Sequence, residues 1–496
     1  MEELYYKSTR DSKIKVKASE AILKGLSSDG GLFVPENIPT LSKNMKDFAE
    51  MSYAETAFEV MKLFFTDFTE EELKNCIEHA YDDKFDTSVI APLVEADGAY
   101  YLELFHGPTI AFKDMALSIL PHLMTTSARK NNIKNEIVIL TATSGDTGKA
   151  ALAGFAGVKG TKIIVFYPKN GVSFIQERQM ITQKGDNTYV VGIHGNFDDA
   201  QTGVKKIFSD EEFAKELEKK GFQFSSANSI NIGRLIPQVV YYVYAYARLL
   251  KEGRIAEKEA MNVVVPTGNF GNILAAYFAK QMGVPIAKLI CASNDNKVLY
   301  DFFQTGEYNK NREFILTSSP SMDILISSNL ERLIYLIANE DSEWNKQQMA
   351  QLSTNGKYAI TKEMQDKLSD FAAGYASEAE TSEMIHSLYE STGYVLDTHT
   401  AVAAAVYKKY KKETNDDVKT VIASTASPFK FAGSVMEAIE GKRENESAFD
   451  LIDRLSAKAN VAIPPAIDEI KTAPVLHNHI CEKDGMKQAV KYFLKI

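Results

Sequence analysis

The segment HGPTIAFKDMAL, at residues 106–117, places one lysine among apolar neighbours just after a Gly-Pro turn. Lys113 stands where a helix is expected to begin, so its amine would be partly removed from water. Desolvation disfavours an ammonium ion and lowers its pKa, and a neutral amine is the nucleophile that Schiff-base chemistry requires. Lys113 is therefore a candidate covalent catalyst, although this segment alone favours a structural role. The alternative is an ordinary lysine whose ammonium reaches the solvent.

A second segment, TATSGDTGKAA at residues 141–151, runs from an expected strand through a hydroxyl-rich turn into a helix of small residues. The backbone N–H groups and hydroxyls of such a turn can bind a carboxylate or a phosphate. The segment is not a P-loop, because the GxxxxGK[ST] spacing is absent. The alternative is structural, with Ser144 or Asp146 capping the helix.

A third segment, VPTGNFGNI at residues 265–273, repeats the order of strand, glycine-rich turn and helix. Its glycines allow a ligand to approach the backbone closely, and the start of the next helix carries positive potential. This pattern predicts a phosphate-binding loop, although it matches neither GxGxxG nor the P-loop. A tight turn with positive φ would explain the glycines alone, but not the repeated Asn-Gly arrangement.

A fourth segment, SANSINIGR at residues 226–234, places small polar residues before an arginine. A guanidinium can donate two parallel hydrogen bonds to a phosphate or carboxylate, so Arg234 is a candidate anion ligand. The alternative is a set of Asn and Ser caps beside a surface arginine. A weaker fifth segment, STASPFKF at residues 424–431, follows the last expected strand.

The elements that must position these segments alternate between short Val- and Ile-rich runs and longer helical stretches from about residue 135 onward. This alternation predicts an α/β fold with parallel sheets. Strands are expected over residues 136–141, 162–167, 189–193, 262–265, 288–292 and 418–423. Helices are expected over residues 198–219, 235–252 and 271–282.

The chain of 496 residues is too long for one simple core and is expected to form two or three domains. Residues 1–95 are mixed and helix-rich, and residues 328–391 are helical and charged without a strand signal, so both are expected as additions around the α/β core. The predicted division is an N-terminal segment 1–95, a small α/β domain 131–221, and a large domain made of 96–130 and 222–496 with a helical insertion at 328–391.

The composition excludes several classes of function. The formal net charge of −10 gives no basic surface for nucleic acid or an anionic membrane, so an anionic substrate would need local cations or backbone N–H groups. The cysteines, at positions 76, 291 and 481, have neither zinc nor disulfide spacing, which favours a reducing cytoplasm and no metal site. No signal peptide and no membrane-spanning run is expected.

Taken together and in this order, the segments resemble the threonine synthase family, in the tryptophan-synthase-β group of pyridoxal-phosphate (PLP) enzymes. HGPTIAFKDMAL is similar to the family's cofactor-lysine segment, TATSGDTGKAA to its substrate and cofactor loop, PTGNFGNI to its PLP-phosphate loop and NSINIGR to its substrate-phosphate site. The opening residues YYKSTR and SEAILKGLSSDGGLFVPENIP resemble the longer members. The resemblance implies the tryptophan-synthase-β-like PLP fold (fold type II), with two open parallel α/β domains, the larger binding PLP.

The resemblance also implies roles for individual residues. Lys113 would carry PLP covalently and act as acid and base, and Thr425 would hydrogen-bond the pyridine nitrogen. The PLP phosphate would lie against Gly268, Asn269, Phe270, Gly271 and Asn272. The substrate carboxylate and nearby oxygens would contact Thr143, Ser144, Gly145, Asp146 and Thr147, and the substrate phosphate would contact Asn228, Ser229 and Arg234.

Two positions leave open questions. Many family members have His where this chain has Ser427, before Pro428, so the resemblance assigns no role to that side chain while Thr425 stays the pyridine ligand. His399 could line the site, with a structural histidine as the favoured interpretation.

The implied reaction converts O-phospho-L-homoserine and water to L-threonine and phosphate, with PLP as cofactor and a monomer favoured over a dimer. A phospholyase or a threonine or serine dehydratase producing a 2-oxo acid is one alternative. A non-catalytic binding protein that keeps the fold is another, although the presence of Lys113 disfavours it.

Overall fold

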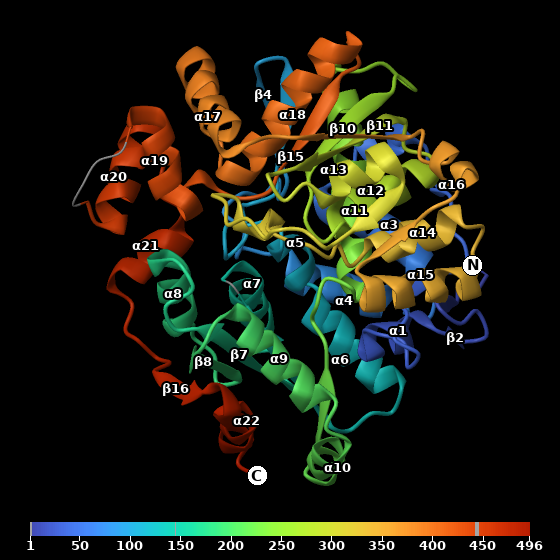
Figure 1. Cartoon of the computed structure of the whole chain (residues 1–496), viewed down its shortest axis with the longest axis vertical. Helices are drawn as coiled ribbons and strands as arrows, with labels where there is room; N and C mark the ends of the chain where they lie inside the picture. Colours follow the sequence, from blue (N-terminus) through green and yellow to red (C-terminus); the bar gives the residue numbers. More distant parts are fainter. Residues whose placement is uncertain (1, 144, 442–445) are drawn as a thin grey trace.

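The structure is a computed structural model that describes residues 2–143, 145–441 and 446–496. It contains two large sheets, one in each half of the molecule, and all six strands expected from the sequence are present (Figure 1). The predicted α/β architecture is therefore confirmed. Within the described residues, no helix is both long and apolar enough to cross a membrane.

The smaller sheet lies in the lower half of Figure 1 and has five parallel strands. In spatial order its strands are β16 (His479–Glu482), β8 (Thr188–His194), β7 (Thr161–Pro168), β6 (Glu136–Ala142) and β9 (Phe222–Ser225). Helices cover both of its faces, so neighbouring residues of one strand enter different cores. In β6, Ile137 and Ile139 face the main core, whereas Val138 and Leu140 face a separate cluster. The helices around it are α7 (Asp146–Phe155), α8 (Phe174–Ile181), α9 (Phe197–Phe208), α10 (Glu211–Lys219) and α22 (Met486–Leu494).

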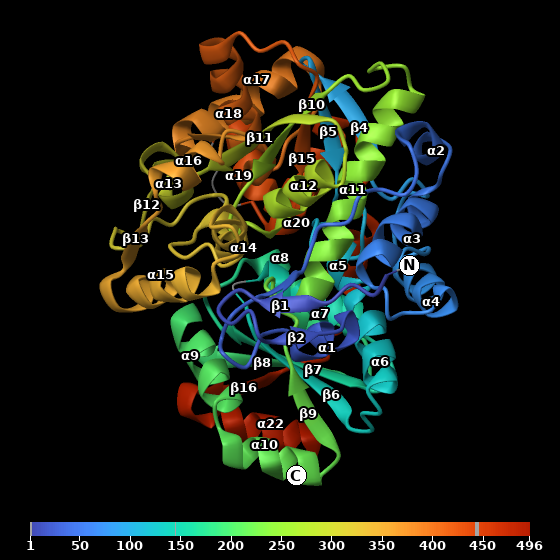
Figure 2. The ribbon, with the colours of Figure 1, turned by 90° about the vertical axis from the view of Figure 1, so that its right-hand side faces the viewer.

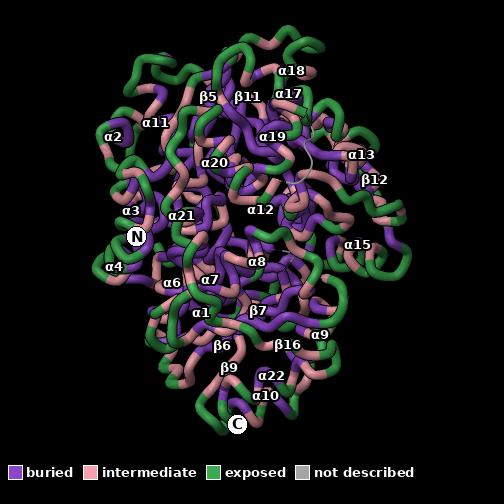
Figure 3. Tube along the Cα trace, turned by 90° about the vertical axis from the view of Figure 1, so that its left-hand side faces the viewer, coloured by how far each residue is buried: buried purple, intermediate pink, exposed green. Residues whose placement is uncertain are grey.

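The larger sheet has six strands, of which only β4 is antiparallel to its neighbour. In spatial order they are β14 (Phe371–Tyr375), β11 (Ile286–Ser293), β10 (Met261–Pro266), β15 (Thr420–Ser424), β5 (Ala99–Glu103) and β4 (Leu93–Ala96). Its inner strands are largely buried, as Figure 3 shows at β5 and β11, whereas the edge strands β4 and β14 are partly exposed. The helices on and around it are α5 (Asp114–Leu117), α6 (Leu120–Lys130), α11 (Ile232–Lys251), α12 (Gly271–Gln281), α13 (Val298–Thr305), α17 (Glu378–Thr392), α18 (Thr398–Thr414), α19 (Ala432–Glu440), α20 (Ala448–Ala459) and α21 (Pro465–Thr472).

The N-terminal segment shares the core of the larger sheet. Its helices α1 (Ala18–Lys24), α2 (Met45–Ala49), α3 (Tyr53–Phe64) and α4 (Glu70–Ala80) pack against α6 and α11 (Figure 2). The segment also forms a small antiparallel sheet from β1 (Tyr6–Ser8), β2 (Lys15–Val16) and β3 (Phe33–Pro35). The strands β1 and β2 come before α1 in the chain, and β3 comes after it. Side chains from both parts belong to one hydrophobic cluster, so the segment is part of the same packed body.

The expectation of a purely helical insertion at residues 328–391 is wrong. This region does contain α14 (Leu330–Ile337), α15 (Ser342–Asn355) and α16 (Lys362–Asp366), but it also contains two strands. β13 (Lys357–Ala359) pairs with β12 (Glu307–Asn309), and β14 forms an edge of the larger sheet. The sequence of β14, FAAGY, has no Val or Ile, and its strand state comes from pairing with β11.

Two predicted boundaries also differ from the structure. The smaller sheet contains the strands β9 and β16 and is covered by α22. All three elements lie within residues 222–496, which the sequence assigns to the large domain. β16 pairs with β8, which lies far away in the sequence, so only the tertiary structure brings them together. The helix expected over residues 198–219 is two helices, because Asp210 accepts from the Phe213 N–H and begins α10.

Candidate active site

The lysine segment is attached to the carboxyl end of the central strand β15. The Phe112 N–H donates to the Thr425 carbonyl at 2.8 Å, and Ala111 forms an isolated β-bridge with Ala426. The short helix α5 follows directly from Lys113. The amine is therefore placed at the edge where the strands of the larger sheet end, which is the usual position of a site in an open α/β fold.

Lys113 is held in a nearly buried position with polar partners. Its side chain is 11% exposed, and its Nζ donates to the Ser321 Oγ at 3.2 Å and lies 3.7 Å from the Asp146 Oδ2. Burial lowers the pKa of Lys113, Asp146 opposes that shift, and the charge of Lys430 adds to it. The structure thus supplies the partly desolvated amine that the sequence predicted.

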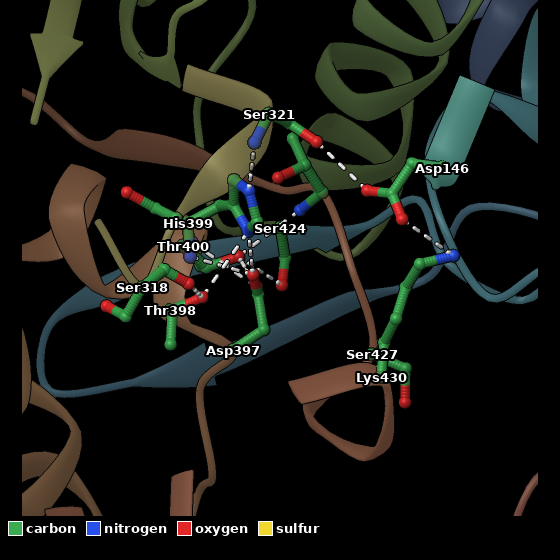
Figure 4. Close-up of polar contacts among 12 residues, drawn as sticks. Asp146, Ser318, Ser321, Asp397, Thr398, His399, Thr400, Ser424, Ser427 and Lys430 are labelled. Carbon is green, nitrogen blue, oxygen red and sulfur yellow. Dashed lines mark hydrogen bonds and ion pairs between the residues drawn. The ribbon is translucent and has the colours of Figure 1, made fainter. Parts of the chain in front are cut away.

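Asp146 is the point where the smaller sheet meets the lysine. Its carboxylate accepts hydrogen bonds at 2.9 Å from both Gln176 Nε2 and Ser321 Oγ. Its Oδ1 also lies 3.2 Å from Lys430 Nζ, whose side chain is fully buried (Figure 4). Burial alone would raise the pKa of Asp146, but the charges of Lys430 and Lys113 outweigh it and hold the pKa well below its usual range.

The turn before α7 is shaped by Thr143 and two glycines. The Thr143 hydroxyl accepts from the N–H groups of Gly145 and Gly148, both at 2.9 Å. Gly145 has φ +135°, and a Cβ there would lie 2.4 Å from the Gln176 amide, so the position requires glycine. Thr147 is partly exposed on the first turn of α7, and Ser144 lies outside the described residues. Thr143 thus supplies an acceptor to the first turn of α7, and Asp146, one of the two residues of the capping alternative, contacts Gln176 and Ser321 instead.

The glycine-rich loop between β10 and α12 is tied down through its carbonyl groups. Phe270 has φ +65° at the start of α12, and a Cβ on Gly268 would lie 2.5 Å from the Ser321 carbonyl oxygen. The Gly268 carbonyl accepts from Ser327 Oγ at 2.6 Å, and the Asn269 carbonyl accepts from the Asn329 N–H at 3.0 Å. The first N–H groups of a helix have no acceptor within it, so the loop can offer donors to an anion.

Asn272 supplies a further donor on the first turn of α12. Its Oδ1 accepts from the hydroxyls of Tyr241 (2.8 Å) and Tyr242. Its Nδ2 is buried and has no hydrogen-bond partner among the described residues. Because a buried unpaired donor is costly, this amide points to a missing acceptor such as a ligand phosphate oxygen.

Arg234 is a second unsatisfied donor, on the first turn of α11. It is 4% exposed, and its Nη1 donates to the Ala227 carbonyl at 3.0 Å. Its Nε is buried without a partner among the described residues. Burial lowers the pKa of Arg234 to about 10, and no charged group offsets that shift. A buried guanidinium without a carboxylate is a receptor for an anion.

Asn329, which sequence reasoning missed, joins the two donor sites. Its Nδ2 donates to the Asn269 carbonyl at 2.9 Å and to the Ser229 carbonyl at 3.3 Å. Arg332 holds it in place through hydrogen bonds to Asn329 Oδ1 and the Ile230 carbonyl. The loop at 268–272 and the segment that includes Asn228 and Ser229 are therefore neighbours; Asn228 is exposed and Ser229 partly buried.

Thr425 lies directly after β15 and is 4% exposed. Its N–H donates to Thr400 Oγ1 at 3.2 Å, and its carbonyl accepts from Phe112. The Thr425 hydroxyl takes no part in these two contacts.

His399 and Ser427 both have structural contacts. The Nδ1 of His399 lies 3.1 Å from Asp397 Oδ1, and its Nε2 accepts from the Ser321 N–H at 3.1 Å (Figure 4). Ser427 accepts from the Phe429 N–H at 3.4 Å and so caps the short turn that carries Lys430.

Sequence reasoning also missed Ser321, Lys430 and Gln176. Lys430 lies within the segment 424–431 that was singled out, and its apolar flanks are the signal that could have found it. Ser321 and Gln176 carry no such signal, because only folding brings them to Asp146.

Comparisons with known families agree along the chain. Residues 5–81 match the family described as "Threonine synthase N terminus", residues 90–426 match "Pyridoxal-phosphate dependent enzyme" and residues 400–473 match "Threonine synthase, C-terminal". These ranges contain every residue that the sequence placed in the site.

Individual relatives give the same result. Threonine synthase-like 1 of Macaca fascicularis is 41% identical over 97% of this chain, and the chain spans 65% of that protein's length. The threonine synthase of Saccharomyces cerevisiae is 38% identical, with 88% of this chain and 89% of that protein covered. A solved structure of PLP-bound threonine synthase from Brucella melitensis is 33% identical and covers 99% of both chains with a TM-score of 0.86.

Proposed function

The chain belongs to the threonine synthase family of PLP-dependent enzymes, and on that premise we propose that it converts O-phospho-L-homoserine and water to L-threonine and phosphate. The observation that carries this proposal is a pair of neighbouring anion receptors beside a buried lysine. One is the start of α12 with the unpaired Asn272 amide, and the other is the unpaired Arg234 guanidinium. A phosphorylated cofactor and a phosphorylated substrate together require two such receptors.

The cofactor would be held by residues from three strand ends. Lys113 would carry PLP covalently, and residues 268–272 would bind its phosphate through backbone N–H groups and the Asn272 amide. The Thr425 hydroxyl would meet the pyridine nitrogen. When bound, PLP supplies an electron-withdrawing ring that stabilises negative charge on the substrate carbons.

The substrate would be held from both sheets. Arg234, with Asn228 and Ser229, would bind its phosphate. The N–H groups and hydroxyls of residues 143–147 would bind its carboxylate. The Asp146 carboxylate already accepts from Gln176 and Ser321 and pairs with Lys430, so its proposed part is to orient these groups.

Lys113 would move the protons that the reaction needs. Its lowered pKa favours the neutral amine, which can take a proton from Cα and from Cβ and return protons to Cγ and Cα. The Cγ–O bond breaks and phosphate leaves, the hydroxyl of water adds at Cβ, and the remaining proton of that water goes to the phosphate. One mobile amine suits several transfers in sequence.

The test is to incubate the purified protein with PLP and O-phospho-L-homoserine and to measure threonine, 2-oxobutyrate and phosphate. We expect threonine and phosphate in equal amounts, and neither product from Lys113→Ala. Formation of 2-oxobutyrate without threonine would overturn the assignment and indicate a phospholyase.

We also propose that the enzyme works as a monomer in the cytoplasm. The contacts among Lys113, Asp146 and the two donor sites form within one chain, so the proposed site does not require a second copy. All three cysteines are free thiols, which fits a reducing compartment. We further propose two domains around the two sheets, the larger one binding PLP and including residues 1–95 in its core.

A further inference from the structure

One residue outside all the segments that sequence analysis identified lies between the two sheets. Ser321 is in the short turn η1 (Pro320–Met322), within the loop that connects β12 to α14. Its hydroxyl contacts both Lys113, at the start of α5, and Asp146, at the start of α7.

The directions of these hydrogen bonds follow from the groups involved. Asp146 is held ionised by its cations, so it can only accept, and the single Ser321 hydroxyl proton is directed to it at 2.9 Å. Ser321 Oγ must then accept from Lys113 Nζ, at 3.2 Å. Lys113 lies farther from Asp146 itself, at 3.7 Å, so the hydroxyl is its closer partner.

The backbone of the turn that carries Ser321 is held by contacts with His399 and Gly268. Its N–H donates to His399 Nε2, which therefore carries no proton, and the ring proton lies on Nδ1 facing Asp397 (Figure 4). Asp397 is buried and also accepts from Thr400. The Ser321 carbonyl lies against Gly268 in the phosphate loop, where no Cβ would fit. The hydroxyl is thus set in position by buried groups on two sides.

We propose that Ser321 is a positioning residue that holds the Lys113 nitrogen through its hydroxyl, with Asp146 fixing the direction of that hydroxyl and His399 fixing the turn. This inference rests on the proposed function, because it concerns the amine that would move the protons. Ser321 has no hydrogen bond to Arg234 or to the segment at 226–234, and its only link to the loop proposed for the substrate carboxylate is its hydrogen bond to Asp146. Its loss should therefore act mainly on turnover and only slightly on substrate binding.

The test compares three variants of the PLP-loaded enzyme. Ser321→Ala removes the hydroxyl, Ser321→Thr retains it, and Ser318→Ala removes a hydroxyl from the same loop that contacts only the exposed Glu378. For Ser321→Ala we expect kcat to fall about ten- to a hundredfold, as for a misplaced catalytic group, with KM changed less than about twofold. Ser321→Thr should recover most of kcat, and Ser318→Ala should match the wild type.

A second measurement needs no turnover. The pH midpoint of the bound-PLP absorbance should shift downward in Ser321→Ala, because the acceptor that stabilises the protonated nitrogen is gone, and should return in Ser321→Thr. An unchanged midpoint and kcat in Ser321→Ala would overturn the proposal, as would a raised KM with normal kcat. If the wild type makes no threonine, the proposed function fails. The difference in pH midpoint between the wild type and Ser321→Ala still shows whether the Ser321 hydroxyl interacts with the Lys113 nitrogen.

Discussion

The charged groups buried around the lysine favour an anionic ligand, even though the whole chain has a net charge of −10. Four cations, Lys113, Lys149, Lys430 and Arg234, outnumber three carboxylates, Asp114, Asp146 and Asp397, among them. Burial lowers the pKa of Lys149 to about 8, so this excess is greatest below that pH. Unpaired positive charge in a low-dielectric setting attracts phosphate and carboxylate groups strongly.

At the residue scale, Arg234→Gln tests the proposed receptor for the substrate phosphate. Losing a charged hydrogen bond of about 2 kcal/mol corresponds to a rise in KM of roughly thirtyfold. Thermal stability should stay the same or increase, because the variant also removes a buried charge that has no carboxylate partner. Steady-state kinetics measure KM, and thermal unfolding measures the stability.

The matched control is Arg248→Gln, on the same helix, where the side chain forms a pair with Glu252. Its KM should equal that of the wild type. An unchanged KM in Arg234→Gln would place the substrate phosphate elsewhere.

At the element scale, the loop that leads to Lys113 is fastened by His106. Its ring nitrogens lie 2.5 Å from Asp86 Oδ1 and 2.9 Å from Glu103 Oε2, and Glu103 also accepts from the Tyr394 hydroxyl. Burial opposes protonation, but the two carboxylates outweigh it and raise the pKa of His106 to about 9. The protonated ring thus joins the end of β5 to the loop around Asp86.

The stability that His106 contributes should depend on pH. A pKa raised from 6.5 to about 9 on folding means that the contribution is complete below pH 6.5 and is lost as the pH rises through 9. The difference in melting temperature between wild type and His106→Gln should therefore be largest at pH 6 and shrink toward pH 10. Replacing the exposed His386 in the same way should give no such trend.

The contact between α5 and α7 gives a second test at this scale. A Cβ on Gly154 would lie 2.1 Å from the Leu117 carbonyl oxygen, so Gly154→Ala must push α7 away from the helix that follows Lys113. We expect a loss of about 1–3 kcal/mol in the free energy of unfolding, measured by urea denaturation. Gly433→Ala in α19 meets no atom within 4 Å, and it should be neutral or stabilising by up to about 1 kcal/mol. Equal stability of the two variants would contradict the close packing.

The elements themselves were predicted well where local pattern decides them. β6, β7 and β10 are runs of Val and Ile buried on both faces, and such runs identify a parallel strand without knowledge of its partners. β14 and β16 lack this pattern, since FAAGY and HICE are short and partly exposed. Their strand state is imposed by the neighbours with which they pair.

At the scale of the whole molecule, the C-terminal part passes from the larger half to the smaller one. After α21, where Arg178 of α8 donates to the carbonyls of Ile470 and Ala473, the chain adds β16 beside β8 and covers the smaller sheet with α22 (Figure 1). Met486, Val490 and Leu494 are buried in that contact. The end of the chain therefore completes a core that begins at residue 136.

Deletion of residues 479–496 should expose that core. Loss of three buried apolar side chains at about 1.5–3 kcal/mol each lowers the free energy of unfolding by roughly 5 kcal/mol, with a lower urea midpoint and earlier proteolysis of the smaller half. Tyr492→Ala, at a side chain 65% exposed on α22, serves as the control with little effect. A truncated protein as stable as the wild type would refute this role of α22.

The sequence by itself determined the α/β class, the family and the segments that contain Lys113, Arg234 and the loop at 268–272. These features are local, because a turn, a cap or a buried strand is encoded in consecutive residues. Tertiary structure alone decided that Ser321, Gln176 and Lys430 meet at Asp146, and that Asn329 joins the loop at 268–272 to the segment before Arg234. Those contacts join residues remote in the sequence, and a serine or an asparagine has no pattern that marks its partner before the chain is folded.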